Sequence, residues 1–391
     1  MLNFSYYSPT EFVFGKDTEK QVGKLLKFYD AKKVMIHYGS GSIIRSGLLD
    51  RVINAIAAEN IEHLEFGGVV PNPRDTLVYE GIEICKKENV DFILAVGGGS
   101  AIDSAKAIAA GAKYDGDFWD FYDRKAEILS ALKIGVILTI PAAGSEGSTA
   151  SVITKTEGLL KRGGYSRYIR PTFAIMNPEL TYTLPRYQTA AGVVDMMSHI
   201  LERYLTRTPD VILTDRLCEA TLVSIIEAAR IVMKEPTNYE ARATISWSGT
   251  IAHNGSLGVG RVEDWTTHGL EHELSALYDV THGAGLAVMF PAYMRYTIDA
   301  DVQRYRRMAV KVFGIKDNPR KPMKVAKAGI DAMESFFKEI GMPTSFDEIG
   351  AKKEDIDQLL SKLRINRGEK FGQFKELTLE DARKIYELAC K

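Results

Sequence analysis

The first half of the chain alternates short apolar runs with amphipathic helical stretches, and this alternation limits the possible folds more than any other feature. Runs over 33–38, 61–66, 91–96 and 134–140 read as strands. The run over 91–96, D-F-I-L-A-V, is almost continuously apolar, which is typical of a central parallel strand buried on both faces. The pattern therefore predicts an open, mostly parallel sheet with helices on both of its faces.

Beyond Pro185 the strand patterns stop and helical patterns take over. Helices are predicted over 189–206, 211–233, 239–253, 282–297, 321–340 and 379–390. Thr378 and Asp381 fit a cap at the start of the last helix. Residues 150–188 are less regular, with a turn predicted at Gly163-Gly164. Since 391 residues also exceed the usual size of one core, we expect an α/β domain over residues 1–187 and an all-α domain over residues 188–391.

Two glycine-rich turns follow predicted strands. Gly97-Gly98-Gly99-Ser100 lies where the 91–96 strand leads into a helix, and Gly39-Ser40-Gly41-Ser42 follows the 33–38 strand. Free backbone N–H groups and the helix dipole attract anions at such helix starts, and open α/β sheets bind nucleotides at this edge. Because G-G-G-S is not the G-x-G-x-x-G fingerprint, a turn in which glycine serves only backbone geometry stays open. The presence of two such turns favours a pyrophosphate cradle.

The second turn also bears on the choice of dinucleotide. An acidic side chain at this strand end would accept hydrogen bonds from the ribose 2′-hydroxyl and repel a 2′-phosphate. The strand end here offers Gly39, Ser40 and Ser42 instead, with Arg45 one turn further on. Hydroxyls and a guanidinium could receive a phosphate, so the sequence favours NADP over NAD.

The helical half contains one aspartate and three histidines with metal-ligand spacing. Asp195 and His199 are four residues apart, so a helix places both on one face. His268 and His282 each precede a glycine, which allows close approach. One carboxylate and three imidazoles suit Zn(II) or Fe(II), and four ligands leave room for substrate if the ion expands its coordination. A single histidine would more often be structural, but this set predicts a mononuclear metal site.

A fourth histidine of this half, His272, lies one turn beyond His268 and could face the same cavity. A free imidazole titrates near pH 6.5, which suits a proton carrier. His272 is therefore the catalytic candidate, while a purely structural role stays open. His37, His63 and His253 have no comparable context and receive no role.

A bound ion and a dinucleotide together predict different chemical roles for the two halves of the chain. The ion would act as a Lewis acid on an alcohol or carbonyl oxygen. Hydride would then pass between the substrate carbon and the nicotinamide. The order of the chain, with the cofactor half first and the metal half second, agrees with this arrangement.

An ordered set of motifs extends these observations along the whole chain. It comprises P-T-E-F-V-F-G at 9–15, Y-G-S-G-S at 38–42, P-N-P at 71–73, A-V-G-G-G-S-A-I-D-S-A-K at 95–106, L-T-I-P-A-A-G-S-E at 138–146, Y-T-L-P at 182–185 and the ligand segments. This set resembles the iron-containing (group III) alcohol dehydrogenases, in the branch of NADPH-dependent butanol dehydrogenases and broad-range aldehyde reductases.

The resemblance implies a fold and an activity. The fold is a Rossmann-like α/β domain followed by an all-α domain, as in dehydroquinate synthase. The activity is metal-dependent, NADP(H)-linked hydride transfer between nicotinamide and a primary alcohol or aldehyde such as butanol or butanal. The family is usually a homodimer or larger, with the N-terminal strand at the subunit contact.

The resemblance also implies site residues. Asp195, His199, His268 and His282 occupy the metal-ligand positions, with His272 nearby. The cofactor positions are Gly39, Ser40, Ser42, Asn72, Gly98, Gly99, Ser100, Asp103, Thr139, Lys161, Tyr182 and Leu184. Gly39 falls where NAD-preferring relatives carry an aspartate, which agrees with the ribose argument. Two residues depart from the family pattern: Ala143 replaces a frequent threonine and Ser148 a frequent asparagine.

Composition limits the other functional classes. The formal net charge is −1 with both signs interspersed, which excludes a nucleic-acid face or a polybasic membrane patch. The three cysteines are scattered and form no disulfide framework, and no export signal or membrane span is visible. We expect a cytoplasmic protein whose partner is a small alcohol or aldehyde.

Three other interpretations are weaker. A dehydroquinate-synthase-like lyase would need several basic residues around the metal, and only Arg203 and Arg261 are near these segments. A glycerol-dehydrogenase-type enzyme would change only the substrate. A regulatory nucleotide-binding protein with a structural metal would more often use cysteine ligands, which these segments lack.

Overall fold

The computed structural model describes residues 1–39 and 41–390, and the chain divides into two compact units. One unit runs from Tyr7 to Leu184, and the other combines Met1–Tyr6 with the chain from Pro185 on. The boundary therefore lies at 184/185, where 187/188 was expected. The first six residues also belong to the helical unit, contrary to expectation, because the Leu2 amide donates to the Gly260 carbonyl at 2.8 Å.

The α/β unit is built on a six-stranded parallel sheet with the strand order β1-β8-β5-β4-β2-β3. Its strands are β1 (Glu11–Phe14), β2 (Lys33–Gly39), β3 (Glu62–Val69), β4 (Phe92–Gly98), β5 (Lys133–Ile140) and β8 (Phe173–Met176). Its α-helices are α1 (Val22–Phe28), α2 (Ser42–Arg45), α3 (Leu48–Ala57), α4 (Asp75–Glu88), α5 (Gly99–Gly111) and α6 (Trp119–Tyr122).

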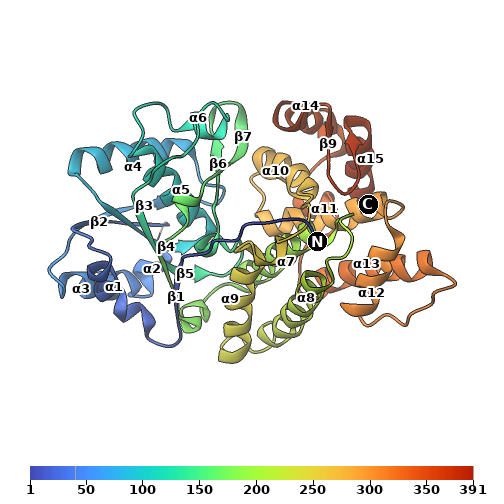
Figure 1. Cartoon of the computed structure of the whole chain (residues 1–391), viewed down its shortest axis with the longest axis horizontal. Helices are drawn as coiled ribbons and strands as arrows, with labels where there is room; N and C mark the ends of the chain where they lie inside the picture. Colours follow the sequence, from blue (N-terminus) through green and yellow to red (C-terminus); the bar gives the residue numbers. More distant parts are fainter. Residues whose placement is uncertain (40, 391) are drawn as a thin grey trace. The chain divides into compact units, whose positions relative to one another are not determined.

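Strand β4 lies inside the sheet and is buried on both faces, as its apolar run predicted. Ile93 and Ala95 pack with residues of α4 and α5, whereas Phe92 and Leu94 pack with residues of α1 and α3. This alternation follows from the two-residue repeat of a strand. Figure 1 shows the resulting layers, with α4 and α5 on one side of the sheet and α1 and α3 on the other.

The strand order also identifies where a ligand should bind. Chain order reverses between β2 and β4, which are neighbours although β3 lies between them in sequence. Doubly wound sheets bind ligands at such a switch point, beyond the carboxyl ends of the strands. These two strands are the ones that end in Gly39 and Gly98.

A β-hairpin occupies the region that looked irregular in sequence, with β6 (Ala150–Lys155) antiparallel to β7 (Leu160–Tyr165). The turn predicted at Gly163-Gly164 is wrong, because both glycines lie within β7 and the chain turns over 156–159. Packing explains the glycines instead: a Cβ on Gly164 would lie 3.3 Å from the Tyr122 ring.

The second unit is predominantly helical. Its α-helices are α7 (Arg186–Tyr204), α8 (Ile212–Val232), α9 (Tyr239–His253), α10 (Thr266–Tyr278), α11 (His282–Thr297), α12 (Val302–Lys311), α13 (Pro322–Glu339), α14 (Ile356–Arg367) and α15 (Leu379–Ala389). A two-stranded ladder of β9 (Lys370–Phe371) and β10 (Leu377–Thr378) means that the unit is not strictly all-α. The predicted cap is confirmed as a capping box of Thr378 and Asp381.

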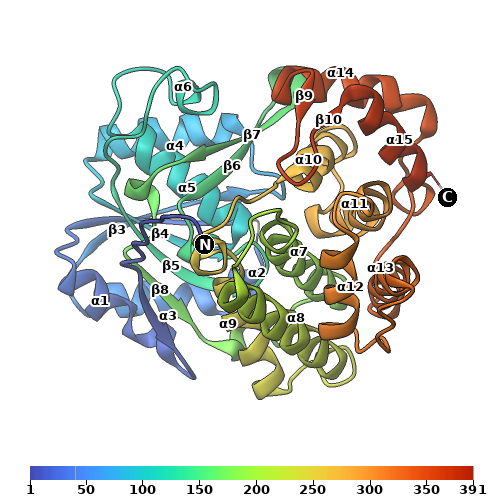
Figure 2. The ribbon, with the colours of Figure 1, turned by 45° about the vertical axis from the view of Figure 1, so that its right-hand side comes forward.

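Helix α7 is the central helix of this unit, and every residue from Thr189 to Tyr204 is buried. It packs against α8, α9 and α11, and α11 in turn packs against α10. Figure 2 shows α7, α10 and α11 as neighbours. Polar residues on the inner faces of these helices are therefore held in a core. Among the described residues, no helix is both long and apolar enough to cross a membrane.

Candidate metal centre and dinucleotide site

The predicted cofactor positions gather at the carboxyl ends of neighbouring strands. Gly39 ends β2, Gly98 ends β4, and Thr139 lies in the last two residues of β5. Gly99 and Ser100 begin α5, Asn72 follows β3, and Tyr182 and Leu184 follow β8. Because these strands are parallel, their ends meet at one edge of the sheet. Ser40, also predicted, lies outside the described residues.

The glycines of the turn after β4 are required by close packing. A Cβ on Gly98 would lie 2.7 Å from Ile140 Cβ, and one on Gly99 would lie 2.9 Å from Ala143 Cβ. The φ of Gly98 is −98°, so this backbone needs no left-handed conformation. The small Ala143, which departs from the family pattern, packs directly against the turn. These glycines let β5 and its following loop approach the first turn of α5, whose N–H groups suit an anion.

Two buried charges on α5 shape the loop that faces this turn. Lys106 Nζ donates to the Ser145, Ser148 and Ala150 carbonyls at 2.7, 3.0 and 2.8 Å, and to both serine hydroxyls. Asp103 accepts from Ser145 Oγ and from the Val152 amide at 2.9 Å. Burial lowers the pKa of Lys106 to about 8 and raises the pKa of Asp103. Ser148, the second departure from the family pattern, thus helps to hold the loop on Lys106.

Two further pairs of side chains border the same edge. Lys161 Nζ donates to Asn72 Oδ1 at 2.9 Å, and both residues are buried, which ties β7 to the loop after β3. Arg45 folds back over the other turn, since its Nη1 lies 3.2 Å from the position of a Cβ on Gly41. Ser42, at the start of α2, is exposed.

The structure brings the predicted metal ligands together within the helical unit. Potential ligand atoms of Asp195, His268 and His282 all lie within 4.8 Å of one another. His282 Nε2 lies 3.8 Å from Asp195 Oδ1, and His199 Nε2 lies 3.6 Å from the same oxygen. The His199 and His268 rings stack with their centroids 4.8 Å apart. Helices α7 and α10 and the start of α11 thus supply one oxygen and three nitrogens.

Two buried glutamates orient the histidine rings, and sequence reasoning missed both. Glu202 Oε1 accepts from His268 Nδ1 at 2.8 Å, and Glu271 Oε2 accepts from His282 Nδ1. Carboxylates behind the second ring nitrogen are the usual support of metal-binding histidines, because they fix the ring and leave Nε2 for the ion. Their positions, three residues after His199 and three after His268, were the available signal.

Electrostatics favours the neutral, ligating form of these imidazoles. Burial lowers the pKa of His199 and of His268 well below the usual value, and nearby positive charges add to this effect. Burial also raises the pKa of Glu202 to about 7. Among the described residues, buried His268 Nε2 has no hydrogen-bond partner. A divalent ion fits this arrangement, since it would use that lone pair together with the neighbouring oxygen and nitrogen donors.

Two more histidines adjoin the centre. His272 is half-buried, with its ring centroid 5.5 Å from that of His282 and 6.4 Å from that of His268. His253, which received no role from the sequence, packs against His199 with centroids 4.1 Å apart. His37 is a buried structural residue of β2 bonded to Ser104 Oγ and the Phe66 carbonyl, each at 2.8 Å.

A doubly wound sheet with an open helix start at its switch point, together with a histidine–aspartate centre, defines a metal-associated dinucleotide oxidoreductase. Two protein-family models match the chain. The model of iron-containing alcohol dehydrogenase matches residues 9–178, and that of the C-terminal part of the Fe-containing alcohol dehydrogenase family matches residues 189–390. The chain belongs to the iron-containing alcohol dehydrogenase family.

Individual relatives match over their whole length. The chain is 43% identical to the probable NADH-dependent butanol dehydrogenase 1 of Bacillus subtilis, covering 98% of this chain and 99% of the relative. It is 36% identical to the NADPH-dependent aldehyde reductase YqhD of Escherichia coli, covering 100% of both. A crystal structure of NADH-dependent butanol dehydrogenase A from Thermotoga maritima superimposes with a TM-score of 0.97 at 40% identity, covering 100% of this chain and 99% of the other. These similarities support NAD(P)-linked alcohol dehydrogenase activity.

Proposed function

We propose that this chain is a metal-dependent, NADP(H)-linked alcohol dehydrogenase and aldehyde reductase acting on primary alcohols and aldehydes such as butanol and butanal. The observation that carries the proposal is the convergence of Asp195, His268 and His282 beside His199, with buried carboxylates behind two of the rings. His282 is partly exposed whereas the other three side chains are buried, and access from one side is what a Lewis acid needs to reach a substrate.

In the proposed mechanism the side chains hold and orient the reacting groups. Asp195, His199, His268 and His282 would hold one Fe(II) or Zn(II) ion, which supplies Lewis acidity to the alcohol or carbonyl oxygen. Glu202 and Glu271 keep two rings in the ligating tautomer. His272, half-buried beside the centre, would carry the proton to or from that oxygen.

The preference for NADP over NAD is supported by the turn after β2. Gly39 carries no carboxylate that could repel a 2′-phosphate, and the Arg45 guanidinium lies over Gly41. Relatives of both preferences exist, since the names of those above specify NADH or NADPH. The remaining cofactor positions would contact the dinucleotide at the carboxyl edge of the sheet. A homodimer and a cytoplasmic location also remain predictions.

The direct test is reconstitution. Protein stripped by a chelator and reloaded anaerobically with Fe(II) or Zn(II) should oxidise NADPH with butanal, and faster than NADH at equal concentration. His268→Ala should lower kcat/KM by about 10³-fold, because a Lewis acid contributes several kcal/mol. His63→Ala, in the other unit, serves as the control. If His268→Ala kept the wild-type rate, the metal assignment would be wrong.

A further inference from the structure

The three proposed histidine ligands are not supported in the same way. His268 and His282 each donate Nδ1 to a buried glutamate, whereas Nδ1 of His199 has no hydrogen-bond partner within residues 1–39 and 41–390. His199 is nevertheless buried on α7, so its ring needs some other support. The residues around His199 provide this support.

Arg203 lies one turn after His199 on α7, and its guanidinium is almost completely buried. A buried cation requires partners, and Arg203 has three. Its Nη1 donates to the His199 carbonyl at 2.8 Å, its Nε lies 3.2 Å from Glu263 Oε1, and its guanidinium carbon lies 4.8 Å from the centroid of the Trp265 ring. Arg203 therefore joins the backbone of His199 to the segment that precedes α10.

Trp265 is held in an unusual backbone conformation. Its φ is 62°, in the left-handed region that a bulky side chain seldom adopts. Such conformations persist only where the surroundings impose them. Here Trp265 Nε1 donates to Glu263 Oε2 at 2.6 Å, and Arg203 covers one face of the indole. The hydrogen bond to Glu263 and the stacked guanidinium together fix the plane of the ring.

The indole fixed in this way faces the histidines of the centre. The Trp265 centroid lies 5.0 Å from that of His268, 5.4 Å from that of His253 and 5.8 Å from that of His199. His253 contacts His199 from its own side. His199 is thus enclosed by aromatic rings, and the arrangement of those rings depends on the indole plane.

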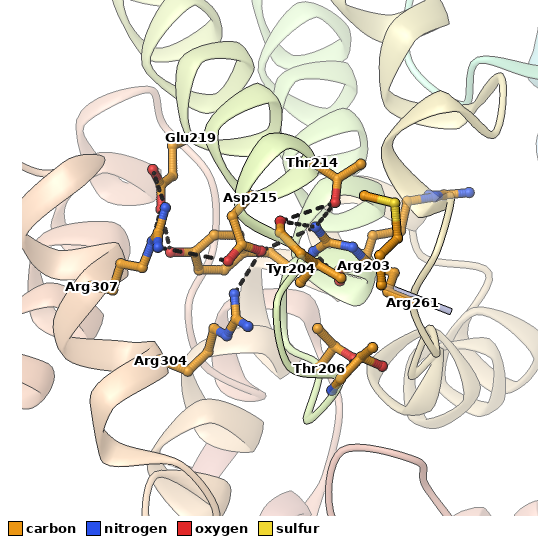
Figure 3. A network of polar contacts seen from close by, with 12 residues as sticks. Arg203, Tyr204, Thr206, Thr214, Asp215, Glu219, Arg261, Arg304 and Arg307 are labelled. Atoms are coloured by element: carbon orange, nitrogen blue, oxygen red, sulfur yellow. Dashed lines mark hydrogen bonds and ion pairs between the residues drawn. The ribbon is translucent and has the colours of Figure 1, made fainter. Parts of the chain in front are cut away.

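Arg203 itself is anchored from behind by a buried charge network. Arg261 Nη1 donates to the Arg203 carbonyl at 2.9 Å, and Arg261 Nη2 lies 3.0 Å from Asp215 Oδ1. Arg304 Nη1 lies 2.7 Å from the same oxygen. Figure 3 shows this sequence of contacts from Arg203 through Arg261 and Asp215 to Arg304. The network restrains the end of α7, which carries Arg203, and the loop that carries Arg261.

We propose that Arg203, Glu263 and Trp265, here called the Arg203 cluster, position His199 for metal binding in place of a carboxylate on its Nδ1. The inference rests on the proposed metal site. The cluster acts through packing and through the His199 backbone. It requires a planar guanidinium that can stack on the indole while it donates to the His199 carbonyl and pairs with Glu263, which a lysine cannot supply.

The test measures metal binding rather than turnover. Co(II) is titrated into metal-free protein in competition with a chelator, and the visible ligand-field spectrum of the Co(II) form is recorded. Arg203→Lys keeps the charge but loses the stacked fork, so affinity should fall by about 10- to 100-fold and the spectrum should change. Arg230→Lys is the matched control, because Arg230 also pairs with a glutamate and stacks on a phenylalanine, Glu339 and Phe336, away from the histidines.

A second variant tests the same cluster in case Arg203→Lys does not fold. Glu263 is partly exposed, so Glu263→Gln should fold, keep a hydrogen bond from Trp265 and lose only the ion pair with Arg203. A smaller fall in affinity with the same spectral change is expected. Wild-type affinity and an unchanged spectrum in both variants would overturn the inference.

His268→Ala separates the two proposals. If wild-type protein binds Co(II) and His268→Ala does not, the metal site stands whatever the Arg203 variants show. If His268→Ala binds as tightly as wild type, the proposed site fails and the role of the Arg203 cluster fails with it.

Discussion

Both units hold charged side chains in the interior at their candidate sites, but these side chains fix different kinds of atoms. In the α/β unit the cation Lys106 donates to carbonyl and hydroxyl oxygens and fixes a stretch of backbone. In the helical unit Glu202 and Glu271 accept from imidazoles and fix side chains. The candidate dinucleotide site, which is made of backbone, thus depends on the shape of a loop, and the candidate metal site, which is made of side chains, depends on the orientation of rings.

Removing the buried cation should give the largest effect. Lys106→Met would leave Asp103 buried without its neighbouring cation and several oxygens without a donor. Breaking such an arrangement costs about 3–5 kcal/mol, measured as the loss in the free energy of unfolding in urea. Lys113→Met, at an exposed residue just after the same helix, should change it by less than about 0.5 kcal/mol. Similar values for the two variants would show that Lys106 does not anchor the loop.

The sequence indicated the fold class, and it singled out the residues that the structure brings together at the candidate metal centre, because both depend on local patterns. The run at 91–96 identified the central strand, and the helices over 239–253 and 282–297 have the predicted bounds. Asp195 and His199 could be paired because they share one helix face. The residue pattern did not show β8, and the N-terminal strand β1 was expected only from the family resemblance, because four residues are too few to show a repeat.

The support of the metal centre could not be read from the sequence. A glutamate in a helix is usually exposed, so Glu202 and Glu271 looked ordinary until the tertiary structure buried them. Helix α10 was missed because its buried face includes His268 and Glu271, which interrupt the apolar repeat. His253 and Trp265 acquire their roles only from contacts across helices.

The buried His37 of the α/β unit should make the stability of the protein depend on pH. Burial lowers the pKa of His37 to about 4, whereas the unfolded chain protonates near 6.5. Between these values the unfolded state binds more protons, so stability falls as the pH falls from 6.5 to 4, by about 3 kcal/mol in total. Urea unfolding at pH 7 and pH 4.5 should show most of this dependence lost in His37→Gln.

The partly exposed His63→Gln provides the reference for this measurement, since it removes a histidine of the same sheet. Its pH dependence should match that of the wild type. An equal loss of pH dependence in both variants would mean that burial of His37 is not the cause.

A milder change in the helical unit tests whether metal binding needs a carboxylate that accepts from Nδ1 of His282. Glu271→Gln keeps the shape but weakens the support of His282 Nδ1, so metal affinity should fall by about 10- to 100-fold. Competition with a chelator measures this. Glu273→Gln is a strict comparison, because Glu273 is buried on the same helix but accepts from Asn366 at 2.8 Å. Equal losses in the two variants would contradict the specific role of Glu271.

The smallest effect is expected on the preference for NADPH over NADH at the candidate dinucleotide site. Arg45→Ala should lower the ratio of kcat/KM for NADPH to that for NADH by about tenfold, because Arg45 is exposed and its charge-assisted hydrogen bond should lie at the lower end of about 1.5–3 kcal/mol. Arg51→Ala, on the next helix and paired with Glu19, should leave the ratio unchanged. A parallel fall with both dinucleotides would argue against a contact between Arg45 and the 2′-phosphate.

The assignment of Met1–Tyr6 to the helical unit makes that unit discontinuous in sequence. The α/β unit is inserted into it and joined at two covalent crossings, after residue 6 and after residue 184. A fragment that starts at Pro185 would lack the segment that covers Gly260, where Met1 and Leu2 lie in contact. Separating the two units therefore requires excision of residues 7–184, with residue 6 linked to residue 185, rather than a single cut.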